Sequence, residues 1–192
     1  MPEPALTLST GIATPIYSGE RDRAHITALA GREGVGAARF NTGLTRSRAE
    51  VRITPQIWEV ALGGGRRCIG LGRVEAHWRL DELLVDIASE YPPGGCNYRI
   101  IREHEDEHVA FARDAYLTWT PRIEATLRDA VMRVKPIVTT GDAKQVANDI
   151  TARLMRALQP AIDGFRAELR SRNASIDTTA NYRLVNSRCP KW

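Results

Sequence analysis

His104, Glu105 and His108 form an H-E-x-x-H pattern, a spacing that can build a hydrolytic zinc site. Residues four apart lie one above the other on a helix, so both imidazoles can reach one Zn²⁺ at about 2.0–2.1 Å. The intervening glutamate then lies beside the metal, where it can act as general base for an activated water. We therefore predict His104 and His108 as metal ligands and Glu105 as the catalytic residue.

The residues around this motif have the phase of an amphipathic helix. At about 100° per residue, residues 99–116 separate into an apolar arc and a charged arc. Among the charged residues of the segment, only Glu105 falls in the apolar arc, beside both histidines. A carboxylate facing a packed interior is costly unless it is paired or near a metal. The phase favours a metal site over the alternative, a hydrogen-bonded histidine pair in the core.

A catalytic zinc site usually has a third protein ligand, and the spacing leaves its identity open. Asp114 fits a longer H-E-x-x-H-x-x-G-x-x-H/D pattern by number, but Phe111 replaces the glycine that would break the helix, so we reject it. If the chain reverses near Thr120, Asp129 or a residue near it approaches the histidines more closely than Glu124. If the helix continues as one rod, neither carboxylate reaches them.

The segments before the motif predict a small sheet. Extended, apolar-rich stretches lie at 51–62, where Pro55 is expected to interrupt the strand, and at 68–78 and 83–91. The three glycines at 63–65 are typical of a hairpin connection. Pro92-Pro93-Gly94-Gly95 then ends the last strand and leads into the motif helix. We expect the 83–91 strand to hold an extended peptide by edge pairing.

The segments after the motif predict two supporting helices. Thr120 followed by Pro121 is typical of a helix N-terminus and predicts a helix over 121–134. A capping-box pattern and an apolar stripe predict a third helix over 142–172. Residues 174–192 are expected to form an irregular tail.

Cys68, Cys96 and Cys189 lack the C-x-x-C spacing of a structural zinc site. One disulfide and one free thiol are expected if the protein is exported, and a bridge from Cys96 to Cys68 or Cys189 would anchor the motif helix. The first 18 residues have neither the basic start nor the apolar run of a signal peptide. A cytoplasmic protein with three reduced cysteines is the alternative.

Composition limits the class of partner. The net charge of +4 is spread among acidic residues rather than gathered into one stripe, so we expect no nucleic-acid binding. No stretch approaches the ~20 apolar residues of a membrane span, so we expect no transmembrane segment.

The run from Val85 through Pro92-Pro93-Gly94 and Cys96 into the H-E-x-x-H motif resembles an uncharacterised bacterial family of secreted zinc-dependent proteases. The resemblance covers roughly residues 45–135. It implies a zincin-like fold, a secreted or periplasmic location, His104 and His108 as zinc ligands, and Glu105 as base.

Members of that family often carry a C-terminal Asp…Thr…His-Gly run. Here the stretch from Ile176 to Tyr182 stands in its place, without the histidine. The resemblance therefore implies Asp177 as the third ligand and Tyr182 as a candidate oxyanion donor. Glu124, Asp129 and Tyr182 stay open as alternative third ligands.

We predict an α+β, zincin-like domain over residues 46–192, with a small, mostly antiparallel sheet followed by the motif helix and supporting helices. Residues 1–45 are predicted to form a partly irregular N-terminal arm. The predicted function is a zinc peptidase acting on peptide or protein substrates. The alternative is a catalytically weak or inactive zincin-like binding module of the bacterial envelope. An amidase or other hydrolase would share the same metal site.

Overall fold

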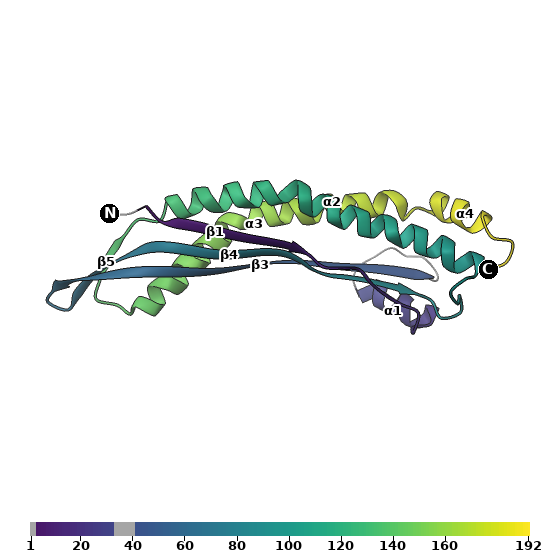
Figure 1. Ribbon diagram of the computed structural model, residues 1–192, viewed down its shortest axis with the longest axis horizontal. Helices are drawn as coiled ribbons and strands as arrows, with labels where there is room; N and C mark the ends of the chain where they lie inside the picture. The colour runs from purple at the N-terminus through teal and green to yellow at the C-terminus, as the bar shows by residue number, and fades with distance from the viewer. Residues whose placement is uncertain (1–2, 33–40) are drawn as a thin grey trace. The chain divides into compact units, whose positions relative to one another are not determined.

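The computed structural model describes residues 3–32 and 41–192 of the chain. It belongs to the α+β class, as predicted, with a sheet and long helices whose order is shown in Figure 1. The chain forms two compact units. One contains Met1–Gly11, Glu50–Arg79 and Leu117–Arg166, and the other contains Ile12–Ala49, Leu80–Tyr116 and Ala167–Trp192.

The described part of the N-terminal 45 residues contains three complete elements, followed by the first residues of the strand that starts at Gly43. The three elements are β1 (Ala5–Ile12), β2 (Ile16–Ser18) and α1 (Arg23–Arg32). The remainder of the predicted arm includes residues 1–2 and 33–40, which lie outside the described residues. A domain boundary between residues 45 and 46 stays a prediction.

Two long strands, β3 (Gly43–Gly63) and β4 (Arg66–Ile87), are joined at the predicted glycine turn (Figure 1). Gly63, Gly64 and Gly65 have backbone φ angles of 81°, 60° and 73°, which residues other than glycine rarely adopt. The two strands expected at 68–78 and 83–91 are therefore one continuous strand up to Ile87.

β4 is the common partner of the other strands in the described part of the chain. β2 pairs with it in parallel, with Ile16 opposite Leu84, while β5 (Ile137–Thr139) pairs antiparallel, with Val138 opposite Cys68. The sheet is thus partly parallel, which the sequence did not predict.

The predicted peptide-binding edge at 83–91 is wrong. β2 pairs with Leu84–Asp86 of β4, and the N–H of Ala88 donates to Thr42 O, just before β3, at 2.8 Å. Because both sides of this stretch are occupied by the protein's own backbone, it offers no free edge to a substrate.

The motif lies in α2 (Cys96–Met132), a single helix that continues through Pro121. The predicted helix start at Thr120 is therefore wrong. The Thr120 hydroxyl accepts a hydrogen bond from the indole Nε1–H of Trp78 at 3.1 Å. The loss of one backbone hydrogen bond at proline is offset by the packing of Ile123 and Leu127, which are fully buried on the following turns.

α3 (Ala143–Ile176) confirms the third predicted helix. Its apolar stripe is buried, as the sequence indicated. The tail predicted to be irregular contains a further helix, α4 (Thr179–Ser187), whose N-cap is Thr178. None of the helices that the structure describes has both the length and the hydropathy of a membrane span.

Candidate metal centre

α2 places His104, Glu105 and His108 on its buried face, as the helical phase predicted. Their exposed fractions are 7%, 4% and 7%. The neighbouring turns of the same face carry Ile101 and Ala112, which are also buried. The three polar side chains are thus held by an apolar helix surface, an environment in which they need partners.

Asp177 brings its carboxylate to both histidines. Its Oδ1 lies 3.2 Å from the Nε2 of His104 and 3.2 Å from the Nε2 of His108. The two Nε2 atoms are 3.3 Å apart. The candidate ligand atoms of the three residues lie within 4.8 Å of one another, so this cluster could hold a metal ion. Asp177 immediately follows α3, which delivers it to the site.

The spacing of these atoms can be compared with a metal site. In tetrahedral coordination with bonds of about 2.0–2.2 Å, ligand atoms are separated by about 3.3–3.6 Å. The three distances in the structure, 3.2, 3.2 and 3.3 Å, lie at or just below the lower end of that range. Two imidazole nitrogens and a carboxylate oxygen suit zinc, and other divalent transition metals also accept this donor set.

The other carboxylates considered as third ligands have different partners. Glu124 pairs with Arg128 of α2 at 2.8 Å, and Asp129 pairs with Arg133, the residue after the end of α2, at 2.7 Å. Because the helix continues past Pro121, the chain reversal that would have brought them to the histidines does not occur. Asp114, rejected from the sequence, has a 64% exposed side chain.

Tyr182 of α4 contacts the cluster through Asp177. Its hydroxyl donates to Asp177 Oδ1 at 2.7 Å, and its ring centroid lies 5.5 Å from that of His104. The sequence placed Tyr182 at the site as a candidate oxyanion donor or ligand. In the structure its hydroxyl proton is directed to the carboxylate.

Asn173 was not predicted from the sequence. Its Oδ1 accepts a hydrogen bond from His108 Nδ1 at 3.0 Å. This holds the Nδ1 proton in place, so that loss of the second ring proton frees Nε2 of His108 to bind a metal, the arrangement found around histidine ligands. Asn173 lies one helical turn before Asp177, and this i, i+4 spacing is the one signal that could have identified it.

The carboxylate of Glu105 is held by the beginning of β3. The Thr45 hydroxyl donates to Glu105 Oε2 at 2.8 Å. Gly43 lies against the other oxygen: a Cβ at that position would be 2.4 Å from Oε1. These contacts join residues about 60 positions apart in the sequence, and nothing in the local pattern indicated them.

The contact between His108 and Asp177 shifts the pKa of each group. Burial alone would lower the pKa of His108, but the hydrogen bond to Asp177 and the charges of Glu105 and Asp177 raise it to about 9. Burial acts to raise the pKa of Asp177, yet the hydrogen bonds from both histidines hold it well below its usual range. The metal-free site therefore pairs a cationic His108 with an anionic Asp177.

The pKa values of Glu105 and Tyr182 are both raised, which favours the neutral forms of these two groups. Burial raises the pKa of Glu105, although both histidines and Thr45 oppose the shift. Burial and the hydrogen bond to Asp177 raise the pKa of Tyr182, so its hydroxyl remains protonated at neutral pH. A buried carboxylate with a raised pKa is a better proton acceptor than an exposed one.

The disulfide joins Cys96 to Cys189, and Cys68 is free. This confirms the prediction of one bridge and one thiol, and it resolves the choice between the two partners of Cys96. Because Cys96 is the first residue of α2, the bridge ties the C-terminal segment to the helix that carries the histidines.

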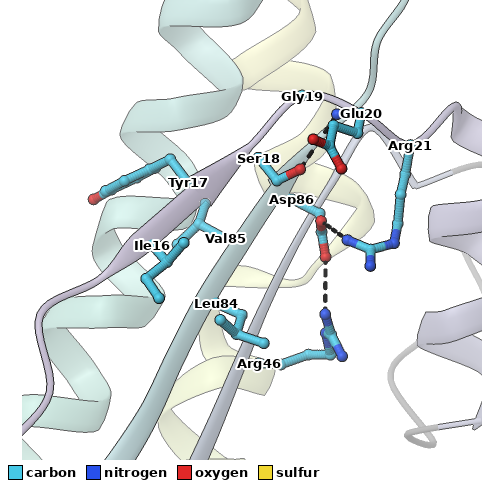
Figure 2. A pocket seen from close by; sticks show the side chains of 10 residues that line it. All are labelled: Ile16, Tyr17, Ser18, Gly19, Glu20, Arg21, Arg46, Leu84, Val85 and Asp86. Atoms are coloured by element: carbon cyan, nitrogen blue, oxygen red, sulfur yellow. Dashed lines mark hydrogen bonds and ion pairs between the residues drawn. The ribbon is translucent and has the colours of Figure 1, made fainter.

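The unit that contains the histidine cluster also has a polar pocket with a volume of about 470 Å³ (Figure 2). At its floor, Asp86 is 2% exposed and bonds to the guanidinium groups of Arg21 and Arg46. Each oxygen of this buried carboxylate is matched by one arginine, which offsets the cost of burying it. These ion pairs connect the segment after β2 with β3 and β4, and we assign them a structural role.

Comparisons of this chain with models of protein families, with curated proteins and with solved structures found no match.

Proposed function

We propose that the protein is a zinc-dependent hydrolase of peptide bonds, in which His104, His108 and Asp177 hold the metal and Glu105 is the general base. The observation that carries the proposal is the set of three ligand-atom separations, 3.2, 3.2 and 3.3 Å, which suits one tetrahedral ion. The fourth position of such an ion would be left for water or substrate.

Zinc bound there would supply a Lewis acid that lowers the pKa of a water towards ~7. The side chains of the protein do the rest. Glu105 accepts the proton released as the water attacks a peptide carbonyl, and then transfers it to the leaving amine. Thr45 holds one oxygen of Glu105, which limits the orientations of the carboxylate. Asn173 keeps the Nε2 of His108 available to the metal.

The disulfide and the sequence resemblance support the proposed setting of the reaction. A disulfide persists in oxidising compartments, which supports a secreted or periplasmic location. The resemblance to secreted zinc-dependent proteases supports a zincin-like fold and a peptide or protein substrate. Location, fold family and substrate class are parts of this proposal.

A second candidate function, a catalytically weak or inactive binding module of the envelope with a structural metal, is favoured by the burial of the site. The three motif side chains are at most 7% exposed, and the carboxylate of Glu105 is enclosed by Gly43 and Thr45. A structural zinc site has no need of an accessible base.

Glu105→Gln separates the two candidates, with Glu107→Gln as matched control because Glu107 is exposed on the same helix. Zinc content is measured together with turnover of a quenched fluorescent peptide library. Hydrolysis that disappears in Glu105→Gln, with zinc retained and Glu107→Gln unaffected, supports the hydrolase. Undiminished turnover rules out the assigned base. Tight zinc binding with strong stabilisation and no turnover in the wild type favours the module.

A further inference from the structure

We propose that Tyr182 is a positioning residue for the metal ligand Asp177, and that the Cys96–Cys189 disulfide holds Tyr182 in place, so that the metal site is complete only in the oxidised protein. This inference rests on the metal centre of the proposed function and adds a redox dependence to it. It does not require the site to be catalytic.

The first step is the contact between Tyr182 and Asp177. The phenol hydroxyl donates at 2.7 Å to Oδ1, the same oxygen that faces the Nε2 atoms of both histidines. A hydrogen bond to a carboxylate ligand restricts its rotation and sets the direction of its lone pairs. The ring of Tyr182 also covers His104, at 5.5 Å between centroids.

The second step is the attachment of α4, the helix that carries Tyr182. None of its residues is buried, and Leu184 is 65% exposed. Because little apolar surface is removed from water, the hydrophobic effect contributes little to holding this helix. At its N-terminal end it is connected to α3 by local bonds, including Asn181 Nδ2 to Ile176 O at 2.8 Å.

The third step concerns the attachment of the chain that follows α4, at the C-terminal end of the protein segment that carries Tyr182. There Cys189, which is 5% exposed, is bonded to Cys96 at the start of α2. The other contacts at this end involve exposed side chains: Arg188 pairs with Glu103 at 2.6 Å, Asn97 donates to Lys191 O at 2.7 Å, and the 41% exposed Trp192 meets the edge of Tyr91 with ring centroids 5.9 Å apart. Exposed pairs of this kind contribute little to stability, so the covalent bond is the main restraint on this end.

The consequence concerns one ligand more than the others. His104 and His108 are fixed by α2 in either redox state, whereas the carboxylate of Asp177 depends on a tyrosine that the disulfide restrains. Breaking the disulfide frees α4 and removes the hydroxyl from Asp177. Loss of an outer partner of a metal ligand typically lowers metal affinity by about 10–100-fold.

The test measures Zn²⁺ affinity by competition with a chromophoric chelator, using the full chain. All variants carry Cys68→Ser, so that no free thiol binds the metal. Adding Cys96→Ser and Cys189→Ser removes the disulfide, and adding Tyr182→Phe removes the hydroxyl. We expect each change to weaken binding by about 10-fold or more. Both together should weaken it no more than the larger single effect, because they act through one contact.

The matched control is Arg188→Ala, which removes the exposed ion pair but keeps the disulfide and should leave the affinity unchanged. The melting temperature of the metal-free protein reports folding separately. A merely structural role would lower that temperature without changing the affinity of the folded protein, and this result would overturn the proposal. Additive effects of the two changes would overturn the link between Tyr182 and the disulfide.

Two further outcomes distinguish this proposal from the metal centre itself. Equal Zn²⁺ affinity in folded protein with and without the disulfide overturns only the redox dependence. Absence of Zn²⁺ binding in both forms overturns the metal centre and this inference with it. If the serine variant does not fold, Tyr182→Phe in the disulfide-bonded protein decides, and an unchanged affinity there overturns the positioning role.

Discussion

Gly43 lies against the carboxylate of Glu105 so closely that a Cβ on residue 43 would be 2.4 Å from Oε1 and 2.8 Å from Cγ2 of Ile101. Neither neighbour can move easily, since both side chains are buried. The start of β3 is therefore shaped around the side chain that we assign as the base, with Gly43 beside one oxygen and Thr45 bonded to the other.

Gly43→Ala is expected to displace Glu105 and to destabilise the fold by about 1–3 kcal/mol, as overpacking usually does. Zinc should remain bound, because the ligands are unchanged, while hydrolysis falls. Thermal unfolding and zinc content measure the two effects. Gly31→Ala is the control: a Cβ there meets nothing within 4 Å, so stability should change little or rise. Equal melting temperatures in the two variants would contradict the packing argument.

Asp177→Ala is expected to lower Zn²⁺ affinity by more than the roughly 10–100-fold typical of an outer partner, because it removes a ligand. Asp129→Asn provides the comparison, since that carboxylate is 70% exposed and pairs with Arg133, four residues further along the chain. Chelator competition measures both. An unchanged affinity in the Asp177 variant would mean that the metal is held without this carboxylate.

Zinc affinity should depend on pH through His108. Its pKa is about 9 in the metal-free protein, so the ring must lose a proton before it binds zinc at neutral pH. Affinity should therefore rise by up to about tenfold per pH unit between pH 6 and 8. Calorimetry in buffers of different ionisation enthalpy counts the released proton. A pH-independent affinity would contradict the pairing of His108 with Asp177.

The same pair makes metal-free stability depend on pH with a defined sign. The pKa of His108 lies above its ordinary 6.5, so its contribution to the free energy of unfolding is complete below about pH 6.5. This contribution is lost as the pH rises through about 9. The depressed pKa of Asp177 places the opposite loss at acid pH. Urea titrations of the metal-free protein at pH 6 and 9.5 should show lower stability at the higher pH.

Trp78 should contribute strongly to the stability of the unit that contains it. It is 1% exposed, packs edge-on against Phe165 and donates to Thr120. Trp78→Ala should cost about 3–5 kcal/mol, and Thr120→Val about 1–3 kcal/mol, because the acceptor of a buried indole is removed. Leu117→Ala, at a 59% exposed position of the same helix, should change stability by less than about 0.5 kcal/mol. Denaturant unfolding ranks the three variants.

The motif helix could be predicted from the sequence because its signals are local. The spacing of His104 and His108 and the position of Glu105 in the apolar arc are set within a few helical turns. The structure places all three on the buried face, as the phase required.

The rest of the site could not be obtained from spacing. Asp177 is 69 positions from His108, and Thr45 is 60 positions from Glu105. No periodicity connects segments so far apart, and a resemblance alone suggested Asp177. Gly43 carries no side chain, so its role is visible only when the carboxylate beside it is known.

The error at Pro121 has a different origin. Thr120-Pro121 is a strong local signal for a helix start, yet the buried residues of the next turns keep α2 continuous. The helix α4 in the tail could have been predicted from a local signal, because Thr178 followed by Asn181 is a capping arrangement at its start.

Cys96 and Cys189 are 93 positions apart, and His104, His108 and Asp177 all lie between them. A single proteolytic cut anywhere in that interval would leave two polypeptides that stay covalently joined. Nicked protein would migrate as the intact chain in electrophoresis without reductant. All three side chains of the candidate metal centre would remain in one molecule.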